Sequence, residues 1–274
     1  MRGIRSTLWT WGRRVVLVSA PAITLSAIAE EIGDREPLRF DSWLLAGHFH
    51  IEPIVVTLAV FSLIGGGAGL ILLSAIGSGV LAARRRYRAA MFVVASVIGA
   101  ELLDRIFKQV FVRARPPVVE YQFTTGMRIA LFGVVGMAAA SLWRTEWRKV
   151  VVVSAAMFLG LLALDGLVSS GVHLNAGNDS FPSGHAVGSM AFIAAMIRLA
   201  WPTRHRWTAV VGGTVFVALV GLSRVYLGYH YLSDVAAGWC LSLVWVMLLG
   251  FAFGTKLDRP QSDLPDSPYT GALV

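Results

Sequence analysis

Long apolar segments alternate with short polar segments along most of the chain. Many of the apolar segments approach 20 residues, about the length of a helix that crosses a hydrocarbon core of about 30 Å. The predicted spans are Val15–Ala29, Pro53–Ala83, Ala89–Phe107, Ile129–Trp143, Val150–Ser169, Ala186–Trp201, Trp207–Leu222 and Val235–Gly254. The pattern therefore predicts an all-α, polytopic transmembrane helical bundle of about eight spans.

Two of these segments are open to a second interpretation. The basic segment Met1–Arg14, the apolar run after it and the small residues "SAIA" are also typical of a cleavable signal, although an uncleaved first span is favoured in a membrane-embedded chain. The short run Ile129–Trp143 is also compatible with a re-entrant hairpin. Residues 1–254 are expected to form a single membrane domain, and residues 255–274 a polar, disordered cytoplasmic tail.

The composition supports a membrane protein and argues against other classes. The chain of 274 residues is 56% hydrophobic and only 15% charged, whereas soluble domains are about 25% charged. Its net charge of +8 comes largely from Lys and Arg in short loops between spans, as the positive-inside rule requires. No nucleic-acid partner is therefore expected. The single cysteine, Cys240, excludes an intramolecular disulfide framework.

The basic loops also predict which side of the membrane each polar segment faces. If Met1 is cytoplasmic, then Arg84–Arg88, Arg144–Lys149 and Arg204–Arg206 all face the cytoplasm. The opposite face then holds the Gly33–Glu52 loop, Lys108–Pro117, Asn178–His185 and Ser223–Asp234. Positive charge on that face opposes the usual bias, so a bound anionic substrate is the natural compensation. Ionisable groups at span ends are functional candidates by default.

Taken singly, most of these polar residues have an ordinary structural explanation. Lys108 lies four residues after Asp104 and is expected to pair with it, although Glu101 and Asp104 could instead bind a cation. Arg113 and Arg115 could extend to lipid phosphates, and this is the only role that the sequence suggests for Arg113. In the Gly33–Glu52 loop, His48 and His50 form an H-x-H pair, which alone does not make a metal site.

Two further groups have both a structural and a chemical interpretation. Ser183 and Gly184 precede a helical run, where a serine caps the helix and leaves backbone N–H groups that bind phosphate. His230 and Asp234 share one helical face if that helix begins early, and the carboxylate would then fix the imidazole tautomer. Together, the cations, the hydroxyl and two histidines predict a phosphoryl-transfer site that requires no metal or other cofactor.

In chain order these residues form three motifs. Lys108 to Pro116 reads K-x6-R-P, Pro182 to His185 reads P-S-G-H, and Ser223 to Asp234 reads S-R-x5-H-x3-D. The three motifs, without gap or substitution, resemble the signature of the type 2 phosphatidic acid phosphatase (PAP2) superfamily. The resemblance implies a helical core of six spans, so the run at about 128–169 would be an inserted two-span hairpin. Typical members have a short loop between the first and second motifs, so the inserted hairpin leaves the substrate specificity open, whereas the catalytic residues carry over.

The resemblance also implies a role for each residue. His230 would attack phosphorus and become a phosphohistidine, Asp234 would orient it, and His185 would protonate the leaving oxygen and later activate water. The phosphoryl oxygens would be held by Lys108, Arg115, Ser183, the Gly184 N–H and Arg224. These are the candidate catalytic and phosphate-binding residues, and no metal ligand is assigned.

The sequence thus favours an integral protein, with a bacterial plasma membrane as the expected location and the site on the periplasmic or extracellular face. Its expected partners are membrane lipids and a lipid phosphate substrate: undecaprenyl diphosphate by a small margin, or phosphatidic acid or phosphatidylglycerol phosphate. The oligomeric state stays open. A phosphotransferase and a non-enzymatic lipid transporter or scramblase are the alternatives. Vanadate-dependent haloperoxidases have a similar signature but are soluble, so the apolar spans argue against that class. Ion-coupled transporters have their sites at the membrane midplane, whereas the polar residues of this chain gather at one face.

Overall fold

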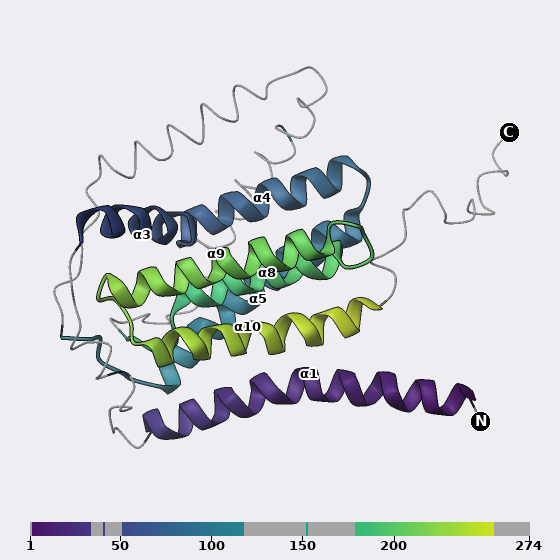
Figure 1. Cartoon of the computed structure of the whole chain (residues 1–274), viewed down its shortest axis with the longest axis horizontal. Helices are drawn as coiled ribbons and strands as arrows, with labels where there is room; N and C mark the ends of the chain where they lie inside the picture. The colour runs from purple at the N-terminus through teal and green to yellow at the C-terminus, as the bar shows by residue number, and fades with distance from the viewer. Residues whose placement is uncertain (1, 34–40, 42–50, 118–151, 153–178, 255–274) are drawn as a thin grey trace, which may run out of the picture.

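The described part of the chain is a bundle of long helices that run roughly side by side (Figure 1). The computed structural model describes residues 2–33, 41, 51–117, 152 and 179–254. Within them the helices are α1 (Arg2–Gly33), α3 (Glu52–Ile64), α4 (Gly67–Ala83), α5 (Tyr87–Val110), α8 (Gly184–Ala200), α9 (Arg206–Tyr226) and α10 (Leu232–Phe253). No strand occurs among these residues, so the all-α prediction is confirmed for them.

Several of these helices have the length and composition of membrane spans. The segment Val15–Ile32 of α1 and the helices α9 and α10 each qualify alone, and α3 and α4 qualify together. Helix α8 is apolar but has only 17 residues. The predicted hairpin at 128–169 and the tail at 255–274 lie outside the described residues, so the count of eight spans stays a prediction.

The predicted span Pro53–Ala83 is not one continuous helix, because the structure divides it into α3 and α4 with a bend of 57°. The break falls at Gly65 and Gly66, in a run of glycines that have low helix propensity. It also brings the backbone very close to α9, since a Cβ atom at Gly65 would lie 2.5 Å from Cγ1 of Val220. The glycines therefore permit both the bend and the close contact.

Helix α8 is the central element that supports the site. It packs against α4, α5, α9 and α10, and α1 covers the other side of α10. Small residues permit this close packing, which is the main source of helix association in lipid. Val187, Ala191 and Ala195 of α8 are fully buried. A Cβ atom at Gly238 of α10 would lie 3.0 Å from the carbonyl oxygen of Ser183, so α10 approaches the start of α8 closely.

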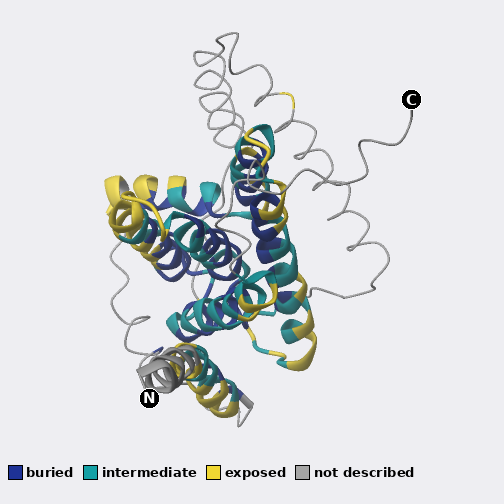
Figure 2. Ribbon diagram, turned by 90° about the vertical axis from the view of Figure 1, so that its right-hand side faces the viewer, coloured by how far each residue is buried: buried dark blue, intermediate teal, exposed yellow. Residues whose placement is uncertain are grey.

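The outer surface of the bundle is apolar where it would face lipid. Figure 2 shows that buried residues occupy the inner faces of the helices and that exposed residues lie on the outside. On α9 the exposed side chains include Trp207, Val211, Val215 and Leu222. Such a large exposed apolar surface is typical of a membrane-embedded protein.

The helix directions place two chemically different regions at opposite ends of the bundle. The turns that join α4 to α5 and α8 to α9 lie at one end and hold the basic residues of Arg84–Arg88 and Arg204–Arg206 (Figure 1). The end of α5, the start of α8, the end of α9 and the start of α10 lie at the other end. This separation agrees with the sidedness that the sequence predicts.

Candidate active site

All the candidate residues predicted from the sequence come together at the end of the bundle opposite the basic turns. Each lies at or next to a helix end, where the backbone changes direction and polar groups are available. Lys108 is in the last turn of α5, Arg115 in the non-helical segment after it, Ser183, Gly184 and His185 at the start of α8, Arg224 in the last turn of α9, His230 in the following loop and Asp234 in the first turn of α10.

Main-chain hydrogen bonds join the three motifs to one another. The N–H of Ser180 donates to the carbonyl of Arg113 at 2.7 Å and connects the first motif to the segment before the second. The N–H of Ser183 donates to the carbonyl of Asp234 at 3.1 Å and connects the second motif to the third. Since these bonds use only backbone groups, the relative positions of the motifs do not depend on the side chains that would carry the chemistry.

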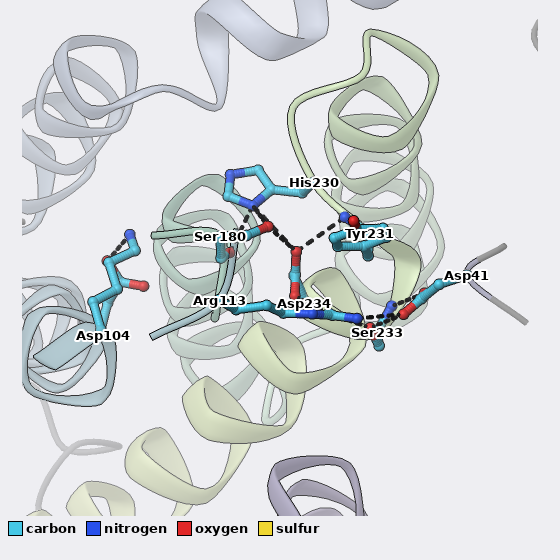
Figure 3. A network of polar contacts seen from close by, with 9 residues as sticks. Asp41, Asp104, Arg113, Ser180, His230, Tyr231, Ser233 and Asp234 are labelled. Carbon is cyan, nitrogen blue, oxygen red and sulfur yellow. Dashed lines mark hydrogen bonds and ion pairs between the residues drawn. The ribbon is translucent and has the colours of Figure 1, made fainter. Parts of the chain in front are cut away.

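The orientation of His230 is set mainly by a backbone carbonyl. Its Nδ1 lies 2.8 Å from the carbonyl oxygen of Ser180 but 3.6 Å from Oδ2 of Asp234 (Figure 3). A carbonyl oxygen can only accept, so Nδ1 carries the proton and donates it. Nε2 then keeps its lone pair, and Figure 3 shows that this side of the ring points away from the Asp234 network. This is the tautomer that a nucleophilic histidine needs.

The condition under which His230 and Asp234 would share a helical face, an early start of the helix, is not met. Helix α10 begins at Leu232, so His230 lies in the loop before it. Asp234 closes a capping box with Tyr231, in which the N–H of Tyr231 donates to Oδ2 of Asp234 at 2.9 Å. The two residues still approach each other, because the loop folds back when the N–H of His230 donates to the carbonyl of Arg224 at 3.1 Å.

The charge state of His230 also suits a nucleophile. Burial lowers the pKa of His230 to about 4, and the nearby positive charges of Arg224 and Lys108 act in the same direction, whereas Asp234 acts against them. The imidazole is therefore neutral near pH 7 and has a free lone pair at Nε2.

Asp234 is completely buried and is held by several donors. The hydroxyl of Ser180 and the N–H of Tyr231 donate to its Oδ2, and the guanidinium of Arg113 donates to its Oδ1. Asp234 thus acts on His230 partly through Ser180, which contacts both residues (Figure 3).

The predicted role of Arg113 in reaching lipid phosphates is wrong. Its guanidinium lies between two buried carboxylates, those of Asp41 and Asp234, and only 12% of the side chain is exposed. It also stacks over the ring of Tyr231, with 4.1 Å between the guanidinium carbon and the ring centroid. Burial alone would lower the pKa of Arg113, but the two carboxylates outweigh it and raise the pKa above its ordinary value.

Two residues of this network, Asp41 and Ser180, had no assigned role in the sequence analysis, and Arg113 had been assigned a different one. Asp41, which lies between α1 and α3 in the sequence, accepts hydrogen bonds from the N–H and the hydroxyl of Ser233 at 3.1 and 2.6 Å. Asp41 lies outside the three motifs, and Arg113 occupies a variable position of the first motif. Ser180 is two residues before the P-S-G-H motif, and its nearness was the only available signal.

The cations of the site have defined partners. Lys108 pairs with Asp104 at 2.7 Å, so the predicted pairing is confirmed. Arg224 donates to the hydroxyl of Ser62 at 2.6 Å and stacks over Tyr229 at 3.9 Å from the ring centroid. The positive charges of Lys108, Arg115 and Arg224 are all close enough to act on His185. The cations of the first and third motifs therefore converge on the histidine of the second motif.

The start of α8 leaves polar groups available for a ligand. Ser183 occupies the predicted N-cap position, but its hydroxyl makes no capping bond. That hydroxyl is buried and has no hydrogen-bond partner among the described residues. A Cβ atom at Gly184 would lie 3.2 Å from Oδ2 of Asp104 and 3.4 Å from Nζ of Lys108, so the helix start lies beside this ion pair. Hydroxyl, helix N-terminus and lysine together form a suitable phosphate environment.

His185 lies against the glycine break between α3 and α4. A Cβ atom at Gly66 would lie only 3.1 Å from Nε2 of His185. The break in the helix pair therefore forms one side of the site next to this nitrogen.

The described residues contain no group of three or more His, Cys, Asp or Glu side chains that could hold a metal ion. The predicted H-x-H pair, His48 and His50, lies outside the described residues.

The fold and the site together define a membrane-embedded helical protein with a polar centre of cations and histidines assembled from helix ends. Comparison with known families gives the same result, since residues 89–256 match the model of the PAP2 superfamily. The match covers more than half of the chain, so the protein belongs to the PAP2 superfamily.

Three curated proteins are similar in sequence. They are phosphatidylglycerophosphatase B of Bacillus subtilis (33% identity over 29% of this chain and 41% of that protein), undecaprenyl-diphosphatase BcrC of Bacillus subtilis (28% over 52% and 77%) and lipid A 1-phosphatase of Porphyromonas gingivalis (30% over 44% and 30%). The chain thus matches less than half the length of the first relative. The crystal structure of a transmembrane PAP2-type phosphatidylglycerolphosphate phosphatase from Bacillus subtilis shares the fold, with a TM-score of 0.56 and 19% identity over 87% of this chain and 95% of that one.

Proposed function

We propose that this protein is an integral membrane phosphatase that hydrolyses a lipid phosphate or diphosphate through a phosphohistidine at His230. The observation that carries the proposal is the tautomer of His230. Its Nδ1–H is directed at the carbonyl oxygen of Ser180, 2.8 Å away, which leaves Nε2 as a free nucleophile among cations. Family membership and the names of the relatives support the same class of reaction.

In the first step Nε2 of His230 attacks phosphorus, and the bond from phosphorus to the leaving oxygen breaks. His185 donates a proton to that oxygen, so the lipid leaves as an alcohol or as a lower phosphate. In the second step His185 accepts a proton from water, the water oxygen attacks phosphorus, and the phosphorus–nitrogen bond breaks to release phosphate. Separate nucleophile and acid–base groups are what covalent catalysis requires.

The remaining residues stabilise charge on the phosphoryl oxygens. Lys108, Arg115 and Arg224 provide positive charge, and the hydroxyl of Ser183 and the N–H of Gly184 provide hydrogen bonds. Phosphoryl transfer depends largely on such positioning and electrostatic stabilisation. Because three cations are present, the proposed reaction uses no metal. The negative charge of the bound phosphate also favours protonation of His185.

The proposed substrate is a membrane lipid, because the site lies at the end of a bundle with an apolar outer surface. Undecaprenyl diphosphate is the first candidate, since the match to BcrC covers 77% of that relative, the largest share among the three. Phosphatidylglycerol phosphate and phosphatidic acid are the next candidates. The proposed location is a bacterial plasma membrane with the site on its non-cytoplasmic face, opposite the basic turns.

The test is phosphate release by the purified protein in detergent that contains EDTA. The substrates are undecaprenyl diphosphate, phosphatidylglycerol phosphate and phosphatidic acid. The key variant is His230→Ala, and its matched control is His205→Ala, which removes an exposed histidine at the start of α9. We expect release that persists in EDTA, disappears in His230→Ala and is unchanged in His205→Ala. Absence of release from every lipid, or equal release by His230→Ala, would contradict the proposal.

A further inference from the structure

We propose that Arg113, held in place by Asp41, is a positioning residue that fixes both groups facing Nδ1 of His230. It lies outside the residues that the three motifs assign to phosphate binding, and it acts through other residues instead of touching the substrate. This inference rests on the proposed function, because it concerns the reactivity of His230.

The first observation is that Arg113 joins two carboxylates that are far apart in sequence. Its guanidinium donates to Oδ2 of Asp41 at 2.8 Å, across 72 residues, and to Oδ1 of Asp234, across 121 residues. Asp41 and Asp234 are 1% and 0% exposed. Two carboxylates buried this deeply need a shared cation, since an uncompensated buried charge is strongly unfavourable.

The second observation is that the same residue also fixes Ser180. The carbonyl of Arg113 accepts the N–H of Ser180 at 2.7 Å. The carbonyl of Ser180 in turn faces Nδ1 of His230 at 2.8 Å. Arg113 therefore holds Asp234 with its side chain and Ser180 with its backbone, and these are the two acceptors nearest to Nδ1 (Figure 3).

The third observation is that Asp41 fixes the guanidinium from the far side. Asp41 accepts from the N–H and the hydroxyl of Ser233 in the first turn of α10, and that hydroxyl also accepts from Arg113 at 2.8 Å. The ring of Tyr231 covers one face of the guanidinium. With carboxylates on two sides and an aromatic ring on a third, Arg113 has one defined position.

The arrangement has a chemical consequence for His230. Arg113 balances part of the negative charge of Asp234, so that this charge does not draw a proton onto the imidazole. The other charged or titratable groups that act on His230 are Arg224 of α9, Lys108 of α5 and His185 of α8. Without Arg113, the charge of Asp234 would be less compensated, and His230 would take up a proton at a higher pH. The loss would appear in turnover and pH dependence more than in substrate binding.

The experiment compares full-length wild type with Arg113→Ala, Arg113→Lys and Asp41→Asn in detergent. Phosphate release from the best lipid substrate gives kcat, KM and the pH profile of kcat/KM, and thermal unfolding reports the fold. For Arg113→Ala we expect kcat to fall about 100-fold, the loss typical of a misplaced catalytic group, while KM changes little. We also expect the acid limb of the profile to move to higher pH. Asp41→Asn loosens Arg113 but removes a negative charge, so we expect kcat to fall by less than in Arg113→Ala and the acid limb not to move to higher pH.

Rescue distinguishes positioning from a purely structural role. Millimolar guanidinium, with the same concentration of urea as control, should restore part of kcat in Arg113→Ala. Arg113→Lys keeps the charge but loses the paired geometry, so its kcat should fall while its acid limb stays in place. Arg204→Ala removes an arginine from the opposite end of the bundle and should leave all values unchanged.

Two results would overturn the inference. One is a folded Arg113→Ala variant with wild-type kcat and pH profile. The other is unfolding of both Arg113 variants together with a wild-type kcat in Asp41→Asn, which would reduce Arg113 to a structural ion pair. Failure of the wild type itself to release phosphate from any lipid would contradict the proposed function and is read separately from these comparisons.

Discussion

The Nδ1 nitrogen of His230 lies closer to the carbonyl oxygen of Ser180, at 2.8 Å, than to the carboxylate of Asp234, at 3.6 Å. A backbone acceptor therefore fixes the tautomer of the proposed nucleophile. The carboxylate of Asp234 supports this arrangement through its hydrogen bond with the hydroxyl of Ser180. The two contributions can be separated by mutation, because a side-chain substitution at residue 180 keeps the carbonyl.

The first prediction concerns Ser180 and Asp234. Ser180→Ala removes the hydroxyl that donates to Asp234 but keeps the carbonyl, so we expect kcat to fall only about fivefold, one missing hydrogen bond being worth about 1 kcal/mol. Asp234→Ala removes the charge and the support of Arg113 together, and we expect a loss of about 10³-fold or more, within the range of acid–base contributions. Phosphate release by both variants at saturating substrate measures the difference. Equal losses would mean that the hydroxyl is as important as the carboxylate.

The second prediction concerns pH. The pKa of His230 is lowered to about 4 by burial, and the reaction needs its neutral form. The His230 contribution to kcat/KM should therefore persist as the pH falls below 6.5, the ordinary histidine value, and should disappear only near pH 4. The check is a pH profile corrected for the ionisation of the substrate phosphate, measured separately by phosphorus NMR. An acid limb that remains near 6.5 after this correction would contradict the assignment.

The third prediction uses two adjacent glycines at the break between α3 and α4. A Cβ atom at Gly66 would lie 3.1 Å from Nε2 of His185, whereas a Cβ atom at Gly67 would have no heavy-atom neighbour within 4 Å. We expect Gly66→Ala to reduce kcat, because the methyl group crowds the nitrogen that protonates the leaving group, and Gly67→Ala to have little effect. Matching losses in the two variants would point to a general effect on the bend.

The fourth prediction concerns stability at the pair of Lys108 and Asp104, which are 2.7 Å apart and mostly buried. Lys108→Ala leaves the Asp104 carboxylate without its partner, so the free energy of unfolding should fall by about 3 kcal/mol. The double variant Lys108→Met with Asp104→Leu removes both charges and should recover much of that stability while activity stays low. Thermal unfolding and phosphate release, measured on the same samples, test this. Equal destabilisation by both variants would show that packing at Lys108 matters more than charge.

The sequence alone predicts those parts of the site that depend on local order along the chain. The positions of Lys108, Ser183 and Arg224 at helix ends follow from the boundaries of the apolar runs, and the structure places all three at one end of the bundle. The start of α10 was harder to predict from the sequence, because the capping box of Tyr231 and Asp234 begins the helix after His230. Local hydrogen bonding thus decided a boundary that hydrophobicity does not indicate.

The parts that the sequence did not predict depend on contacts between distant residues. Arg113 pairs with residues 72 and 121 positions away, and no local pattern distinguishes it from an arginine at a lipid surface. The break at Gly65 and Gly66 was also missed, because an apolar run that contains glycines is equally compatible with one long span. Only the packing of Val220 against Gly65 shows why the chain bends there.

The main-chain bond from Ser183 to Asp234 has a consequence for the biosynthesis of the protein. A chain is made from its N-terminus, so the start of α8 exists before its partner in α10 has been synthesised. Until α10 docks, the segment that carries Ser183 lacks this anchor, and His230 is not yet in place. The last described helix to be synthesised therefore completes the centre, and a nascent chain that stalls before it would be inserted but inactive.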